Sequence, residues 1–207
     1  MAKKDLKAGL VIGVAVGLLS QFILTNVVAN PGYLLRFGAL VGFTFLAPLA
    51  LLVAYLIGKA IPVVYQFAKF AAVGALNTFM DVGILNLEIF LSGQATGLYY
   101  PVFKGISFLV ATTNSFFWNK FWTFGSRNTK VSGEALKFYL FSAIGWVLNV
   151  GIATFIVNGL TKPSAVSVNI WANIGALCGV VVSLIWDFAA YKFFVFKQPT
   201  ADAAETK

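Results

Sequence analysis

The chain has 207 residues, of which 59% are hydrophobic and 11% are charged, and its mean hydropathy is +0.86. Soluble domains carry about a quarter charged residues, so this composition excludes a soluble globular protein and leaves no length for a sizeable catalytic domain outside a membrane. Histidine is absent and Cys178 is the only cysteine, which excludes His-based catalytic triads, His/Cys zinc sites and an intrachain disulfide. The net charge of +8 fits cationic loops on anionic lipid, so we expect membrane lipids and no nucleic acid as partners.

Six apolar runs follow one another along the chain, and each is long enough for a membrane-spanning helix of about 20 residues. Turn residues separate the runs, such as Asn30-Pro31-Gly32 after the first run and Pro62 after the second. The sequence therefore predicts an all-α integral membrane protein with six transmembrane helices. The runs cover residues 8–28, 35–61, 67–91, 102–124, 135–160 and 167–194.

The first run, 8–28, admits two interpretations. The lysines before it and Val27-Val28-Ala29 at its end are typical of a secretory signal with a weak cleavage site. Gly9, Gly13 and Gly17 are spaced by four residues and form one smooth helix face, which favours a retained helix that packs closely on a neighbour. We expect the retained helix.

The distribution of positive charge predicts the orientation in the membrane. With both termini in the cytoplasm, the inner loops and ends collect twelve lysines and arginines, and the outer loops keep only Arg36, Lys104 and Lys162. The chain is therefore predicted to be a multi-pass protein of the cytoplasmic (inner) membrane with both termini cytoplasmic.

The last four runs contain two copies of one two-helix unit. Residues 69–84 match residues 137–152 at a constant offset of 68, and residues 116–124 match residues 188–196 at an offset of 72. Because each copy holds two helices, the copies share one orientation, and the sequence predicts two parallel two-helix repeats. Transporters commonly place their binding sites between such copies, whereas a plain duplicated four-helix bundle is the alternative.

The two copies also resemble a known family. Three motifs carry the resemblance, and each lies in the expected helix: Lys69-Phe70 with Asn77 and Asp81, the block 114–124, and the block 186–196. Together they resemble the GtrA-like family over about residues 67–197. The chain departs from the family's common pattern at four positions, since asparagine is usual at 187 and 191 and arginine at 120 and 192.

The resemblance implies a small membrane protein of cell-surface polysaccharide synthesis that flips a polyprenyl-phosphate-linked sugar across the membrane. It leaves residues 1–65 as an N-terminal two-helix extension, 66–198 as the four-helix domain and 199–207 as a disordered cytoplasmic tail. An integral lipid-sugar transferase ranks last, because no loop is long enough for a nucleotide-sugar site or carries clustered carboxylates for a metal. We therefore expect no enzyme, no catalytic residue, no metal and no cofactor.

Polar residues inside the apolar runs are the first candidate binding residues, because a charge in hydrocarbon is costly and needs a partner or a task. Asn77 and Asp81 share one face of the third run, and Asn149 lies on the matching face of the second copy. These faces are expected to line a polar cavity for a sugar. The simpler interpretation is a helix–helix hydrogen bond from Asp81 to Asn149 or Ser142.

A second candidate group lies at the cytoplasmic ends of the fourth and sixth runs. Lys120 and Lys192 occupy matching positions, and we expect their ammonium groups to bind the phosphate of a lipid headgroup, with polar and aromatic neighbours positioning them or contacting the sugar. The simpler interpretation is an interfacial aromatic belt with snorkelling lysines. The neighbours are Asn114, Asn119, Trp122, Trp186, Asp187 and Tyr191.

Two further functions compete with flipping. The chain is alternatively a non-transporting membrane partner that anchors or recruits a polyprenyl-phosphate glycosyltransferase, with Gly9, Gly13 and Gly17 as the docking face. A small cation exporter with Asp81 as proton carrier is the other alternative, since a membrane carboxylate is the usual device. Because four to six helices form a small transporter, we expect that the chain could work as a homodimer.

Overall fold

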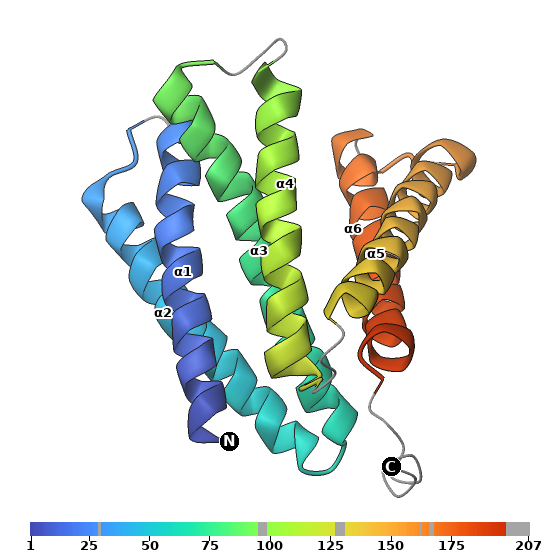
Figure 1. The fold of residues 1–207 in the computed structure, drawn as a ribbon. Helices are drawn as coiled ribbons and strands as arrows, with labels where there is room; N and C mark the ends of the chain where they lie inside the picture. The colour runs from blue at the N-terminus through green and yellow to red at the C-terminus, as the bar shows by residue number, and fades with distance from the viewer. Residues whose placement is uncertain (29, 95–98, 127–130, 162, 166–167, 198–207) are drawn as a thin grey trace, which may run out of the picture. The chain divides into compact units, whose positions relative to one another are not determined.

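The computed structural model describes residues 1–28, 30–94, 99–126, 131–161, 163–165 and 168–197, and every regular element in them is a helix (Figure 1). Within these residues, three of six α-helices continue directly into a short π-helical segment. The α-helices are α1 (Lys3–Val27), α2 (Tyr33–Gly58), α3 (Pro62–Ser92), α4 (Tyr99–Trp118), α5 (Val131–Thr154) and α6 (Val168–Ala190). The π-helical segments are η1 (Asn119–Thr123) after α4, η2 (Phe155–Gly159) after α5 and η3 (Tyr191–Val195) after α6.

The six helices coincide with the six predicted apolar runs. The largest differences lie at the helix beginnings, as in α3, which starts at Pro62 because proline has no amide hydrogen to lose in the first turn. In the described part of the chain, three helices are long and apolar enough to cross a membrane: Lys3–Thr25 of α1, Tyr33–Gly58 and Pro62–Ser92. The prediction of an all-α membrane protein is confirmed.

The helices form two compact units, Met1–Thr123 and Phe124–Lys207. In the first unit, α1 packs on α2 and α3, and α3 packs on α4 (Figure 1). In the second unit, α5 packs on α6 and η3. The N-terminal extension therefore shares a compact unit with the first predicted copy. The predicted tail 199–207 lies outside the described residues.

The contact between α1 and α2 depends on the glycine face of α1. A Cβ atom added at Gly13 would lie 2.5 Å from the Phe43 carbonyl oxygen and 2.9 Å from the Thr44 Cα. Added Cβ atoms at Gly9 and Gly17 would also approach α2, to 3.0 Å from the nearest heavy atom. The structure thus shows the close packing that the retained-helix interpretation predicts, and it places α2 on the proposed docking face.

The ends of α4 and α6 have the same rare conformation. The segments η1 and η3 occupy matching positions, because Asn119–Thr123 and Tyr191–Val195 are related by the offset of 72 residues that aligns the two copies. π-Helical turns are uncommon and occur frequently at functional sites. This shared backbone feature supports the duplication independently of residue identity, and it lies exactly where the second group of candidate residues was predicted.

Candidate functional site

The first copy holds a polar seam between α3 and α4. Asn114 Nδ2 donates to Asn77 Oδ1 at 2.8 Å, and Ser107 Oγ donates to Asp81 Oδ1 at 2.7 Å. Asn77 Nδ2 donates to the Val73 carbonyl oxygen of its own helix at 2.7 Å. Two predicted residues, Asn77 and Asn114, thus bond directly to each other. Asp81 accepts a hydrogen bond from α4 of its own copy, whereas the simpler of its two interpretations placed its partner in the second copy.

The second copy holds an equivalent seam between α5 and the C-terminal helix α6 with η3. Asn149 Nδ2 donates to Ser183 Oγ at 3.2 Å, and the hydroxyls of Ser142 and Tyr191 share a hydrogen bond of 2.5 Å. Trp186 Nε1 donates to the Phe141 carbonyl oxygen at 3.1 Å. Asn149, Trp186 and Tyr191 therefore all lie at the interface of these two helices, as hydrogen-bonded interhelical contacts.

Asp187 differs from the other members of the second seam. Its side chain lies against the backbone of Gly145, where an added Cβ would stand 2.9 Å from Asp187 Cγ and 3.0 Å from Oδ2. Its Oδ1 atom is buried and has no hydrogen-bond partner among the described residues. Buried polar atoms are nearly always hydrogen-bonded, so this carboxylate oxygen is an acceptor that is open to a ligand or to water.

Asn119, the first residue of η1, offers a second open acceptor. Its side chain is 1% exposed, and its Nδ2 donates to Ser115 Oγ at 3.3 Å. Its Oδ1 is buried without a hydrogen-bond partner among the residues that the structure describes. In the aligned copies Asn119 corresponds to Tyr191, so both π-helical segments begin with a buried polar side chain.

The two predicted phosphate-binding lysines occupy equivalent places within their own units. Lys120 Nζ lies 5.7 Å from the centre of the Phe121 ring, and its side chain is buried. Lys192 Nζ lies 5.6 Å from the Phe188 ring and 5.8 Å from the Phe193 ring. Both ammonium groups thus lie among aromatic rings at the second position of a π-helical segment. Their convergence on one phosphate stays a prediction.

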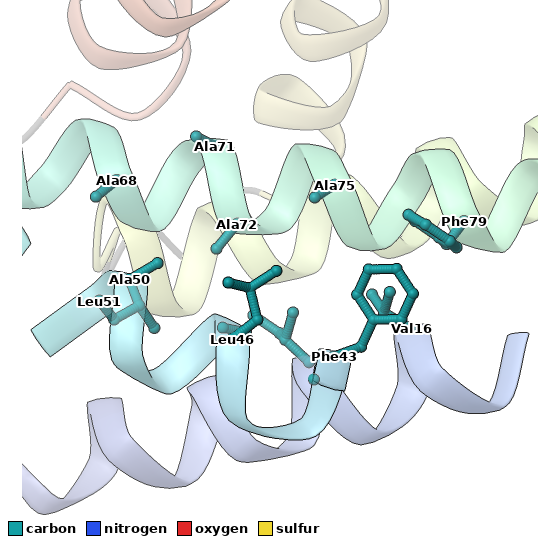
Figure 2. Close-up of a pocket in the computed structure, with 13 residues that line it drawn as sticks. Val16, Phe43, Leu46, Ala50, Leu51, Ala68, Ala71, Ala72, Ala75 and Phe79 are labelled. Carbon is teal, nitrogen blue, oxygen red and sulfur yellow. The ribbon is translucent and has the colours of Figure 1, made fainter. Parts of the chain in front are cut away.

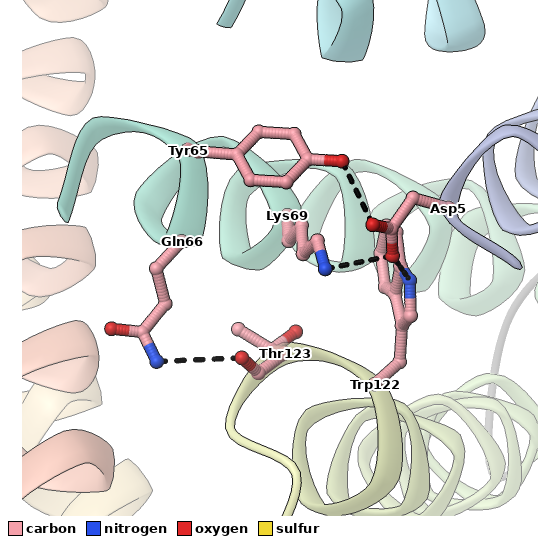
Figure 3. Close-up of polar contacts among 6 residues, drawn as sticks. All are labelled: Asp5, Tyr65, Gln66, Lys69, Trp122 and Thr123. Carbon is pink, nitrogen blue, oxygen red and sulfur yellow. Dashed lines mark hydrogen bonds and ion pairs between the residues drawn. The ribbon is translucent and has the colours of Figure 1, made fainter. Parts of the chain in front are cut away.

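A cluster that sequence reasoning missed lies at the N-terminal end of the first unit, around the carboxylate of Asp5 (Figure 3). Lys69 Nζ stands 2.7 Å from Asp5 Oδ1, Trp122 Nε1 donates to the same oxygen at 2.8 Å, and the Tyr65 hydroxyl donates to Oδ2 at 3.0 Å. The ammonium of Lys69 also lies 4.9 Å from the Tyr65 ring and 5.3 Å from the Trp122 ring. Three donors from α3 and η1 therefore converge on one carboxylate from α1.

This cluster gives the predicted residue Trp122 a partner outside the four-helix domain. The side chains of Asp5 and Lys69 are only 5% and 11% exposed, so the ion pair is shielded from solvent. Asp5 is 60 residues from Tyr65 and 117 residues from Trp122 in the sequence. A single acidic residue in the first turn of a helix gives no sequence signal for partners at such distances.

An apolar groove of about 310 Å³ lies between α1, α2 and α3 (Figure 2). The wall formed by α3 consists of Ala68, Ala71, Ala72 and Ala75, and it ends at Phe79. Because these side chains are small, the groove is left open where leucines would fill it. This groove was not predicted from the sequence.

Comparison with protein families gives one match. The family model described as GtrA/DPMS, transmembrane domain, matches residues 69–196, which is more than half of the chain. The matched segment includes η1, η3 and all three sequence motifs, and it leaves α1, α2 and the first residues of α3 outside. No curated protein and no solved structure matches the chain.

Proposed function

The chain belongs to the GtrA/DPMS transmembrane domain family, and from that membership we propose that it flips a polyprenyl-phosphate-linked sugar across the cytoplasmic membrane. Proteins with this domain are linked to polyprenyl-phosphate sugars. In this proposal the lipid-linked sugar serves cell-surface polysaccharide synthesis, and the protein supplies a path for the polar headgroup and carries out no covalent chemistry.

The observation that carries the proposal is the open acceptor of Asp187 between α5 and α6. A carboxylate oxygen buried without a donor is costly, and polar groups within membrane helices mark substrate pathways. Such an oxygen would accept hydrogen bonds from the hydroxyl groups of a sugar. Gly145 supports this role, because the absence of a Cβ is what lets the carboxylate lie against α5.

The remaining seam residues support a path for a sugar in the same way. Asn77 and Asp81 of the first copy and Asn149 of the second supply hydrogen-bonding groups on corresponding helices of the repeat, where hydrocarbon offers none. The hydroxyl groups of a sugar headgroup can replace the present partners of these side chains, one hydrogen bond at a time. We propose that the seams open and close in this manner during flipping.

The orientation completes the proposal. With both termini in the cytoplasm, η1 and η3 end at the inner leaflet, where a lipid-linked sugar is made. Lys120 and Lys192 then lie at the depth of its phosphate. Their substitution by glutamine is expected to weaken binding of the lipid-linked sugar, whereas substitution of Lys137, which is exposed in α5, is expected to change it little.

The test is transport into or out of sealed vesicles that contain the purified protein and a polyprenyl-phosphate sugar. A membrane-impermeant glycosidase added outside cleaves the outer-leaflet sugar only, so flipping exposes the protected inner pool with time. We expect Gly145→Ala to slow this exposure, because its Cβ displaces the Asp187 carboxylate, and Gly151→Ala to leave it unchanged, because nothing lies within 4 Å of an added Cβ there. An inner pool that stays as protected as in protein-free vesicles would refute the proposal.

The competing function, recruitment of a glycosyltransferase, loses its proposed docking surface. The face of Gly9, Gly13 and Gly17 is covered by α2 within the same unit. The vesicle assay also separates the two functions, since a recruiting partner would leave the inner pool protected in the absence of the glycosyltransferase.

A further inference from the structure

The Asp5 cluster has the form of an anion-binding site whose occupant is part of the chain. The ammonium of Lys69, the indole N–H of Trp122 and the hydroxyl of Tyr65 are directed at one carboxylate at 2.7, 2.8 and 3.0 Å (Figure 3). Charge-assisted hydrogen bonds of this kind are the strong ones in proteins. Two of the donors, Lys69 and Trp122, belong to the segment that matches the family, whereas Asp5 belongs to the helix outside it.

The chemistry of the occupant indicates what else would fit these donors. A carboxylate carries one negative charge on two acceptor oxygens. A phosphodiester, such as the linkage between a polyprenyl chain and a sugar, also carries one negative charge on two free oxygens. Asp5 therefore presents to the donors the same charge and the same number of acceptors as the headgroup linkage of the proposed substrate.

The α3 wall of the apolar groove begins at Ala68, three residues after Tyr65 of the cluster. Tyr65, Ala68, Ala72 and Ala75 are spaced at three and four residues, which places them on one face of the helix, and the groove begins within one turn of Tyr65. From Ala68 to Phe79 the groove wall runs about 16 Å along the axis of α3. Its lining is aliphatic and aromatic (Figure 2), which suits a hydrocarbon chain.

We propose that Tyr65, Lys69 and Trp122 bind the phosphodiester of a prenyl lipid whose chain lies in the alanine-walled groove, and that Asp5 is an internal competitor which the phosphate displaces. The identity of the lipid rests on the proposed function. Asp5 lies in the first turn of α1, so only the beginning of that helix has to move when a phosphate enters. The N-terminal helix thereby sets the affinity of the first unit for the lipid.

The test measures binding of farnesyl methyl phosphate, a short prenyl phosphodiester without a sugar, to the full-length protein in nanodiscs. Tryptophan fluorescence reports binding, because Trp122 is one of the donors. We expect Asp5→Asn to bind the probe several-fold more tightly than the unsubstituted protein, since a neutral amide competes less well for the ammonium of Lys69. Lys69→Gln is expected to weaken binding by about tenfold, the effect of losing one charge-assisted hydrogen bond.

The groove is tested with a matched pair of substitutions. Ala75 lines the groove, and Ala143 is its counterpart in the second copy and is likewise exposed on its helix. Ala75→Phe is expected to remove the advantage of farnesyl methyl phosphate over dimethyl phosphate, which has the same headgroup charge and no chain. Ala143→Phe is expected to preserve that advantage. Equal binding of both phosphates to the unsubstituted protein would show a free-anion site and overturn the role of the groove.

The internal competitor is tested against a purely structural role. If Asp5 only holds α1 in place, Asp5→Asn weakens binding or leaves it unchanged, and either result in a protein of unchanged helical content overturns the proposal. Tyr65→Phe gives a second measurement that keeps the ring packing, and it is expected to weaken binding by removing one donor. Binding of the sugar-free probe without flipping in the vesicle assay would refute the proposed function alone, whereas flipping without an effect at Asp5 and Lys69 would refute this site alone.

Discussion

Substitution of Gly13 by alanine tests the packing that holds α1 in the first unit. The added Cβ would lie 2.5 Å from the Phe43 carbonyl oxygen, 2.8 Å from the Thr44 carbonyl oxygen and 2.9 Å from the Thr44 Cα. All three atoms belong to the backbone of α2, so no side-chain rotation relieves the contact. The two helices must move apart.

The magnitude follows from a comparison with Gly42 of α2, where an added Cβ meets nothing within 4 Å. At such an open helical position, alanine is expected to stabilise the fold by about 0.5–1 kcal/mol through helix propensity alone. At Gly13 the overpacked methyl group is expected to cost about 1–3 kcal/mol. Because the propensity gain applies at both helical positions, it cancels, and Gly13→Ala should be less stable than Gly42→Ala by about 1–3 kcal/mol in unfolding free energy.

The assay is reversible unfolding in mild detergent by titration with a denaturing detergent, followed by far-ultraviolet circular dichroism. Gly9→Ala and Gly17→Ala are expected to fall between the two variants, because their nearest contacts are at 3.0 Å and include flexible leucine side chains. If Gly13→Ala proves as stable as Gly42→Ala, the close approach of α1 and α2 is refuted, and the placement of Asp5 that depends on it is refuted too.

Two further predictions concern the seam and the orientation. Asp81→Asn is expected to keep the fold and the hydrogen bond from Ser107 while slowing flipping. Asp81→Leu removes an acceptor of the fully buried Ser107 hydroxyl and should lower the unfolding free energy by about 1–3 kcal/mol in the same assay. Full flipping activity of Asp81→Leu would show that Asp81 has no role in transport. In a variant with Cys178 replaced by serine, a cysteine at Gly93 should react with an impermeant maleimide added outside intact cells, and one at Gly133 only after permeabilisation; the reverse pattern would exclude cytoplasmic termini.

The helices were predictable because hydrocarbon imposes a simple physical demand. A membrane-spanning segment must be apolar and must make all its backbone hydrogen bonds within itself. Each helix therefore corresponds to a continuous apolar run in the sequence. The glycines of α1 were informative for the same reason, since a four-residue spacing of small side chains has few uses other than close packing. The family resemblance was carried by blocks that lie within single helices, and the family match confirms it.

Partners across helices were less predictable, because they depend on which helices pack together. One of the two interpretations of Asp81 gave it a partner in the second copy, Asn149 or Ser142, whereas the structure shows a hydrogen bond from Ser107 on the adjacent helix α4. Asp5 was missed because its donors lie on α3 and η1, and no local pattern connects them. The π-helical segments were also missed, since one additional residue in a turn leaves the apolar pattern almost unchanged.

The contact between Asp5 and Trp122 also sets an order of events during biosynthesis. Asp5 is made before all three of its donors, and the last of them, Trp122, is made 117 residues later. At ordinary rates of translation this interval lasts on the order of ten seconds. During this interval the carboxylate of Asp5, in the first turn of α1, lacks the hydrogen bond from the Trp122 indole. The first unit can therefore complete the Asp5 cluster only after η1 has been made, and truncated chains that end before this point should hold the Asp5 carboxylate through Lys69 and Tyr65 alone.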